Sequence, residues 1–350
     1  MRALLTRPGD LGPTEEAAWR ALQRAGPGTE SPFCSLTFAR AVGRARPGAR
    51  VVVLEDGPVT AAFLAFQPGR DGLARPIGWP MNDLHCVVGA PPPEELRRAV
   101  HAAGVRGWRF EHAPAAHPSL DGHRYDGTVV HVPVIDLAGG YPAWFAGVGR
   151  RGRSPITRSP RRRAALARAA GELTLEWHSS RTGDLGRLFA WKAARYEQTR
   201  RLLADPTVWG IVEELSVSDD PACRGKLSVL RAGDTPIAAD LGLLGPRGLA
   251  GWFAGYDPDH QRFSPGTILF LAVAEAAADQ GVERFDLGYG QHRYKVPLAS
   301  STYPVAAGTV WAHRSEALAR RAYRRLVYRP LHPGGPAGAV PELAQLPTAS

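Results

Sequence analysis

The chain has 350 residues, of which 44% are hydrophobic, 8% aromatic and 22% charged. This composition is that of an ordinary soluble globular protein, and the length is sufficient for two compact cores. The formal net charge of +10 favours acidic partners such as phosphates, nucleic acid or an anionic membrane surface.

Cysteine spacing and hydropathy exclude several classes of protein. Cys34, Cys86 and Cys223 occur without a CxxC spacing or a histidine pair at ligand spacing, so neither a disulfide framework nor a metal site is predicted. Three buried free thiols are the simplest interpretation. The N-terminus lacks the apolar core of a signal peptide, and the longest apolar run, near Ile268–Ala278, is too short to cross a bilayer. We therefore expect a cytoplasmic protein without a transmembrane segment.

Apolar periodicity and turn residues predict a mixture of helices and strands in the first half of the chain. In chain order, we expect helices at 14–25 and 35–45, a hairpin of strands at 50–55 and 59–67, a loop at 68–93, a helix at 93–104, strands at 108–112 and 129–137, and a short helix at 141–148.

The second half begins with Arg150 to Arg168, which carries eight arginines and no acid. The same reasoning then predicts helices at 160–170, 184–198 and 205–215, strands at 172–178, 227–231, 237–244 and 249–256, a helix from residue 264, strands at 282–287 and 303–311, a basic helix at 315–328 and a disordered tail from residue 334.

Two short patterns recur in both halves. Val52-Val53-Leu54 aligns with Ser228-Val229-Leu230, and Gly104–Phe110 aligns with Gly281–Phe285. The separations are nearly equal, 176 residues from Leu54 to Leu230 and 175 residues from Arg109 to Arg284. Equal separations favour a duplicated α/β unit.

The stretch from Leu249 to Lys295 reads as strand, turn, helix and strand, and the rest of the chain is organised around it. Its helix opens at Ser264-Pro265-Gly266. Serine is a preferred N-cap, proline suits the first helical position, and glycine lets a ligand approach the bare backbone. Because free N–H groups at a helix start attract anions, this turn is a candidate phosphate site; the alternative is an ordinary helix start.

This order of two antiparallel strands, a third strand, a helix and a parallel strand resembles the core of GNAT acyltransferases. Three motifs are more specifically similar to the CelD/BcsL-type (BioF2-like) acetyltransferases: Ser264-Pro265-Gly266, Asp286-Leu287-Gly288-Tyr289-Gly290 and Tyr294-Lys295. One feature departs from the family pattern. Simpler GNAT enzymes have an acyl-CoA loop of the form Gln/Arg-x-x-Gly-x-Gly/Ala, whereas the segment Gln261–Gly266 supplies a single glycine.

The resemblance extends from about residue 161 to 310 and implies an α/β fold of tandem GNAT-like units, with mixed central sheets flanked by helices. It is also akin to Fem-type transferases. We expect a degenerate GNAT-like unit at 1–148, an acyltransferase unit at 149–312, a basic helix at 313–333 and a disordered tail at 334–350.

The resemblance implies an enzyme that moves an acyl group, expected to be acetyl, from acyl-CoA to an amine or hydroxyl of a sugar, polysaccharide or small metabolite, without a metal. The acyl-CoA pyrophosphate would lie at Ser264, Gly266 and Thr267. The oxyanion donor would come from the strand that contains Trp252 and Ala254.

Acyl transfer also needs a base for the acceptor proton, and two carboxylates are candidates. Asp286 points away from the face of Phe285 and Leu287 on its strand, and Asp240 lies within an apolar run. A buried Asp286 paired with Arg293 or Lys295 is the structural alternative. Tyr289 is a candidate proton donor to the leaving thiolate, as is Tyr294.

Substrate contacts are expected from both halves of the chain. Tyr294 and Lys295 follow the second motif, and Lys295 suits a phosphate or Asp286 better than a nucleophilic role, since nothing around it indicates a depressed pKa. Asp83 and His85 lie in the loop of the first half and are candidate contacts to the acceptor.

Two alternatives stay open. An aminoacyl-tRNA-dependent transferase of the Fem kind would use Arg150 to Arg168 to bind tRNA, although the same run also suits a solvated linker or a clamp on CoA phosphates. A non-catalytic binding protein would keep the fold for recognition alone. The oligomeric state is not predicted.

Overall fold

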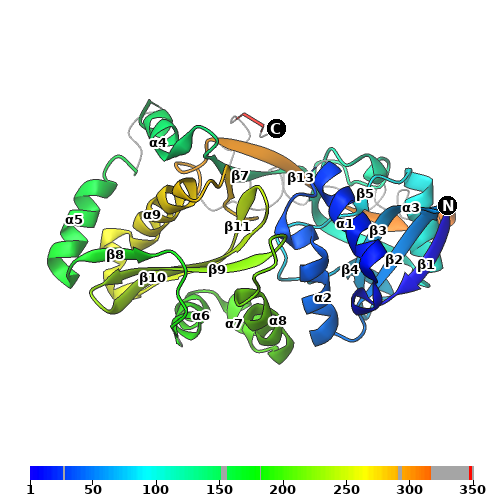
Figure 1. Cartoon of the computed structure of the whole chain (residues 1–350), viewed down its shortest axis with the longest axis horizontal. Coiled ribbons are helices and arrows are strands. Elements are labelled where there is room, and N and C mark those ends of the chain that lie inside the picture. The colour runs from blue at the N-terminus through cyan, green and yellow to red at the C-terminus, as the bar shows by residue number, and fades with distance from the viewer. Residues whose placement is uncertain (27, 151–155, 182, 291–293, 317–346, 349–350) are drawn as a thin grey trace. The chain divides into compact units, whose positions relative to one another are not determined.

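The computed structural model describes residues 1–350 except 27, 151–155, 182, 291–293, 317–346 and 349–350. The chain divides into two compact units, which we treat separately (Figure 1). Unit 1 comprises Met1–His131 and Pro304–Ala339, and unit 2 comprises Val132–Tyr303 and Val340–Ser350. The predicted basic helix, from residue 317 on, and most of the predicted tail lie outside the described residues.

Unit 1 is a mixed sheet covered by helices. Its helices are α1 (Pro13–Ala25), α2 (Leu36–Ala45) and α3 (Pro93–Ala102), and its strands are β1 (Arg2–Thr6), β2 (Arg50–Asp56), β3 (Val59–Pro68), β4 (Leu73–Pro76), β5 (Val88–Gly89), β6 (Gly107–Pro114) and most of β13 (Ser301–Trp311). The strand order is β1-β2-β3-β4-β6-β13, with β5 paired to β3. All of these pairs are antiparallel except β4 with β6.

The predicted helices and the hairpin of unit 1 are confirmed, but three strands were not foreseen. β4 and β5 lie within the predicted loop at 68–93, and β1 was not predicted. Strands of two to five residues are too short to show an alternating pattern. They form because β2, β3 and β6 offer hydrogen-bonding edges to them.

Unit 2 contains the stretch from Leu249 to Lys295, in which the three motifs lie. Its helices are α4 (Gly140–Arg150), α5 (Ser159–Ala170), α6 (Asp184–Arg195), α7 (Glu197–Leu203), α8 (Pro206–Ser216) and α9 (Pro265–Asp279), and its strands are β7 (Val130–Asp136), β8 (Leu173–Glu176), β9 (Arg224–Ala232), β10 (Thr235–Leu244), β11 (Gly248–Tyr256) and β12 (Arg284–Asp286). The strand order is β7-β12-β11-β10-β9-β8. β11 and β12 run parallel, as predicted for two strands joined by one helix.

The helix predicted at 184–198 is broken at Tyr196. This residue has φ −128° and ψ 111°, so α6 ends at Arg195 and α7 begins at Glu197. Neither glycine nor proline marks the break, which is why the sequence does not predict it. The guanidinium of Arg195 lies over the rings of both Tyr196 and Tyr256 on β11, at 5.6 and 5.1 Å from the ring centroids.

The sheet of unit 2 is covered on both faces, α9 on one side and α6 to α8 on the other (Figure 1). Leu230, Ala238, Leu249 and Phe285 belong to the core cluster that contains α9. Alternate strand residues face the opposite side, where the ring of Phe253 meets Phe189 of α6 at 5.0 Å. The sheet is therefore a rigid support for residues at the end of β11.

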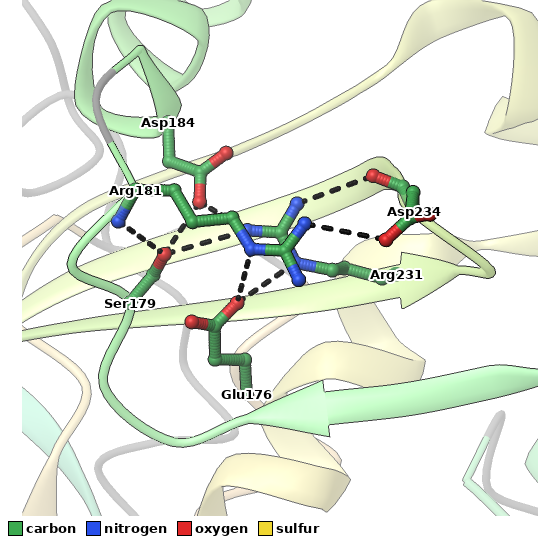
Figure 2. A network of polar contacts seen from close by, with 6 residues as sticks. All are labelled: Glu176, Ser179, Arg181, Asp184, Arg231 and Asp234. Carbon is green, nitrogen blue, oxygen red and sulfur yellow. Dashed lines mark hydrogen bonds and ion pairs between the residues drawn. The ribbon is translucent and has the colours of Figure 1, made fainter.

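A polar network fixes α6 to the β9–β10 hairpin (Figure 2). Arg231 is buried; its Nε donates to Glu176 at 2.8 Å, and its Nη2 donates to Asp184, the first residue of α6. Ser179 Oγ also donates to Asp184, at 2.6 Å. Such a network stays stable only while both carboxylates keep the guanidinium as partner.

The limits of the compact units differ from the division at 148 and 312 expected from the sequence. β7 and α4 pack with unit 2, where Trp144 Nε1 donates to Leu298 O at 3.2 Å. Most of β13 pairs with β6 in unit 1. The borders of the two GNAT-like repeats themselves stay a prediction.

Candidate active site

β11 and β12 pair only over a short length. Gly248–Ala250 are in register with Arg284–Asp286, where β12 ends, whereas β11 continues to Tyr256. Beyond Ala250, no strand of the described structure pairs with this edge of β11. A strand edge of this kind presents backbone N–H and C=O groups to an extended ligand.

A β-bulge reshapes β11 at the point where β12 ends. Leu241 is paired with Phe253 and Gly242 with Gly251, so Trp252 is the additional residue. A Cβ on Gly251 would lie 3.1 Å from Asp286 O, so glycine permits the close approach of the two backbones. After the bulge, Ala254 lies directly across from Asp240 of β10.

The start of α9 lies against the end of β11. A Cβ added to Gly266 would be 3.4 Å from the ring of Tyr256. Ser264 is the N-cap residue, as predicted, but it has a left-handed backbone (φ 57°, ψ 55°) and its side chain makes no capping hydrogen bond. The helix start is therefore held by backbone contacts alone.

Fewer amides are available at this helix start than the sequence suggests. The amides of Thr267 and Ile268 donate to Ser264 O at 3.0 and 3.3 Å, and Pro265 has no N–H. No carbonyl in the described part of the chain accepts the amide of Gly266, which is half-buried. Of the predicted phosphate-site residues Ser264, Gly266 and Thr267, Gly266 thus carries the amide best placed to bind an anion.

Cationic and aromatic side chains surround this helix start. Arg195 hydrogen-bonds to Tyr256 Oη and lies over its ring. The ring of Tyr294, which is 45% exposed, stacks on Phe270 of α9 at 5.9 Å. The guanidinium gives the region a positive charge suited to phosphate.

Asp240 is the carboxylate whose protonation is most perturbed. It is 2% exposed, and burial raises its pKa to about 7, although the charges of Lys192 and Lys295 oppose the shift. Register places it between Ser228 of β9 and Ala254 of β11, on the same face of the sheet. A carboxylate with a pKa near 7 can both accept and release a proton at neutral pH.

Asp286 is engaged in local structure. Its Oδ1 accepts a hydrogen bond from Gly288 N at 2.8 Å and its Oδ2 accepts one from Tyr303 Oη at 2.5 Å. The guanidinium of Arg284 lies 4.7 Å above the ring of Tyr303. No spacing in the sequence identifies Tyr303 as this partner, because it lies on the next strand.

Lys295 points inward. It is 4% exposed, and its Nζ donates to Gly288 O at 2.9 Å and to Tyr289 O at 3.1 Å. Gly288 and Gly290 both have positive φ, 78° and 104°, which explains why the motif carries glycine there. The motif is therefore a turn held by Asp286 and Lys295, with the half-buried Tyr289 within it. Arg293 lies outside the described residues.

Asp83 and His85 belong to unit 1. His85 is 1% exposed, and its Nδ1 accepts hydrogen bonds from the amides of Glu111 and His112 at 3.0 and 3.2 Å. Burial, and secondarily the charge of His112, lowers the pKa of His85 well below its usual value. His85 thus packs within unit 1, Asp83 is half-buried, and their role as acceptor contacts stays a prediction.

Neither a metal centre nor a membrane span is found in the described part of the chain. No group of three or more His, Cys, Asp or Glu among these residues has the arrangement of a metal site. No described helix combines the length and the apolar character that crossing a bilayer requires.

The two α/β units, with an unpaired edge of β11 beside the start of α9, give a mixed α/β fold similar to that of tandem GNAT proteins. Residues 156–296 match the family model described as acetyltransferase (GNAT) domain, and they form a GNAT acetyltransferase domain of the BioF2-like/CelD kind. This confirms the resemblance seen in the sequence. The protein is an acyltransferase enzyme.

Solved structures confirm the fold. FemX matches with a TM-score of 0.57 at 10% identity, covering 93% of this chain and 100% of FemX. A tandem GNAT protein from the clavulanic acid biosynthesis pathway matches with a TM-score of 0.50 at 12% identity, covering 89% and 98%. Identities this low show similarity of fold alone. No curated protein sequence matches the chain.

Proposed function

We propose that the protein transfers an acyl group, acetyl in the simplest case, from acyl-CoA to an amine or hydroxyl of a sugar, polysaccharide or small metabolite in the cytoplasm. The observation that carries this proposal is the edge of β11 that β12 leaves unpaired, ending beside Gly266. A thioester supplies the activated acyl group, and the chain supplies binding, orientation and proton transfer.

The residues at the end of β11 and the start of α9 fit an extended, anionic donor. The Gly266 amide and the Arg195 guanidinium suit its phosphates, together with Ser264 and Thr267. The backbone of β11 from Trp252 through Ala254 suits the extended arm and the developing oxyanion. The bulge supports this assignment, because it changes the direction of the strand at the position where the acyl group would react.

Asp240 is the residue we assign as the general base. Its pKa of about 7 matches this task, whereas both oxygens of Asp286 accept hydrogen bonds that hold the turn. Asp286 is then a positioning residue for Tyr289. Tyr289 and Tyr294 are the candidate donors of a proton to the leaving thiolate, and Lys295 holds the turn that carries Tyr289.

Titration calorimetry with acetyl-CoA and longer acyl-CoAs tests the donor site. Gly266→Glu places a negative charge at the amide proposed to bind phosphate, so binding is expected to weaken by at least about 100-fold, as for a lost charge-assisted contact. Gly186→Glu on α6 is the matched control, since its site has open space and an ordinary backbone. Absence of heat from the wild type, or equal binding by both variants, contradicts the proposal.

A second candidate is an aminoacyl-tRNA-dependent transfer of the Fem kind. Arg158, Arg161, Arg163 and Arg168 are exposed on or next to α5, and α5 contacts Pro258–Phe263, the turn that precedes α9. Neutralising Arg161 and Arg163 would then weaken tRNA binding and flatten its salt dependence. Tight acyl-CoA binding with no tRNA binding at 150 mM salt, roughly the physiological ionic strength, favours the first proposal.

A further inference from the structure

Two of the three cysteines line one cavity inside unit 1. The cavity lies between α1, the turn Pro32–Cys34 and the segment that leads into β5. Its lining residues are Trp19, Phe33, Cys34, Ser35, Ala65, Pro76, Ile77, Asn82, Leu84, Cys86 and Val88. Cys34 and Cys86, which are distant in the sequence, therefore face a common space.

The two thiols differ in exposure and interact with each other. Cys34 is 2% exposed, whereas Cys86 is half-buried. Burial, followed by a hydrogen bond with the Cys86 thiol, raises the pKa of Cys34. Cys223 is fully buried in unit 2 and does not line the cavity.

The surrounding structure holds both cysteines in place. The indole Nε1 of Trp19 donates to Cys34 O at 2.9 Å. On the other side, Val88 pairs with Phe63 of β3 two residues after Cys86. Asn82, 3% exposed, also lines the cavity, and no described residue donates to its Oδ1. The lining of the cavity is therefore partly polar.

We propose that Cys34 and Cys86 form a redox site at which a peroxide oxidises the two thiols to a reversible intramolecular disulfide. This inference does not depend on the proposed acyl transfer. Cys86, the more exposed thiol, is the attacking cysteine that meets a small oxidant, and the buried Cys34 is the resolving cysteine.

The oxidation of the two thiols to a disulfide takes place in two steps. The Cys86 thiolate attacks one peroxide oxygen, the O–O bond breaks, and a sulfenic acid and one water are formed after proton uptake. The Cys34 thiol then attacks the Cys86 sulfur while its proton passes to the leaving oxygen, the S–O bond breaks, and a second water is formed. Two thiols lose two electrons and two protons, and one peroxide becomes two waters.

Peptide mapping of the wild-type protein tests the site directly. The reduced protein is freed of reductant, treated with hydrogen peroxide, blocked with a maleimide and digested. We expect a pair of peptides joined through Cys34 and Cys86, lighter by two hydrogens than the reduced pair and separated again by dithiothreitol. Overoxidised Cys86 beside a maleimide-labelled Cys34, or a link to Cys223, would overturn the proposal.

Three variants sharpen the result. Cys223→Ser is the matched control and is expected to form the same linked peptides. Cys34→Ser should leave a Cys86 sulfenic acid that dimedone traps, and Cys86→Ser should leave Cys34 reduced. In the wild type, oxidation should raise the midpoint of thermal unfolding by a few degrees, because the bond closes a loop in the unfolded chain.

Discussion

Asp240 is kept in the core at a cost to stability. Its carboxyl has a pKa of about 7 in the folded chain, against a value near 4 when unfolded. At a pH between these two pKa values, Asp240 is protonated in the native state and ionised in the unfolded chain. Stability therefore falls as the pH rises from about 4 to about 7 and is constant above, and three pKa units correspond to about 4 kcal/mol. A residue retained at such a cost is a candidate for catalysis.

The variant Asp240→Asn tests separately the loss of stability caused by the buried carboxyl and its proposed role as general base. The amide cannot ionise, so the variant is expected to be more stable than the wild type by a few kcal/mol at pH 8, with little difference at pH 4. Acyl transfer should fall at least about 100-fold, as for loss of a general base. Urea unfolding at both pH values and a steady-state assay measure these effects. A variant that is fully active, or equally stable at pH 8, contradicts the assignment.

Asp286 illustrates a residue whose pattern is clear but whose partner is not. Alternation places its carboxylate opposite the buried side chains of Phe285 and Leu287, and the structure agrees. Its partner is Tyr303, from a strand that begins 15 residues later. The spacing of residues along a chain does not predict which strand will lie beside them, and so this partner was missed.

The start of α9 is the element on which the donor site depends. Serine at φ 57° is strained, because its Cβ crowds the following carbonyl, at a cost of about 1 kcal/mol. Strain of this kind persists where the surrounding structure requires it, and it often marks a functional turn.

Ser264→Gly is expected to relieve the strain and to raise the free energy of unfolding by about 0.5–1 kcal/mol. Ser35→Gly is the matched control. Ser35 also begins a helix, α2, but has φ −76° and accepts a hydrogen bond from Phe38 N at 3.0 Å, so its loss should destabilise slightly. Chemical denaturation compares the two. If Ser264→Gly also weakens acyl-CoA binding, the hydroxyl contacts the donor; loss of stability in Ser264→Gly would contradict the strain argument.

β11 and β12 show how element length controls the site. The sequence predicts a strand at 282–287, but only Arg284–Asp286 pair with β11. The end of this pairing is what leaves β11 open beyond Ala250, and it depends on the turn at Gly288 that Asp286 and Lys295 hold. The motif residues were identified from sequence, and the structure gives them a structural role in opening the edge.

At the scale of the whole molecule, unit 1 contains histidines that are buried as neutral rings. Burial lowers the pKa of His112 to about 4, and it also lowers the pKa values of His85 and His117. The unfolded chain binds these protons at about pH 6.5. Unit 1 is therefore expected to lose stability as the pH falls from about 6.5 to about 4, because the unfolded state then binds more protons.

His112→Gln is expected to reduce this loss by a few kcal/mol at pH 4 relative to pH 7. The measurement is the free energy of unfolding from pH 4 to pH 7, compared with the wild type. The sign is opposite to that expected for Asp240, so the two variants together distinguish the contributions of the two units. Parallel pH profiles for His112→Gln and the wild type would show that His112 is not the responsible group.

The sequence by itself determined the order of the longer helices and strands and the motif that starts α9, because helical periodicity, alternation and turn residues act over a few neighbouring positions. The tertiary structure alone decided that β12 ends early, that β11 bulges at Trp252, that Asp240 is buried and that Tyr303 meets Asp286. Each of these depends on which distant segments become neighbours, and that is set by packing of the whole sheet rather than by any local pattern.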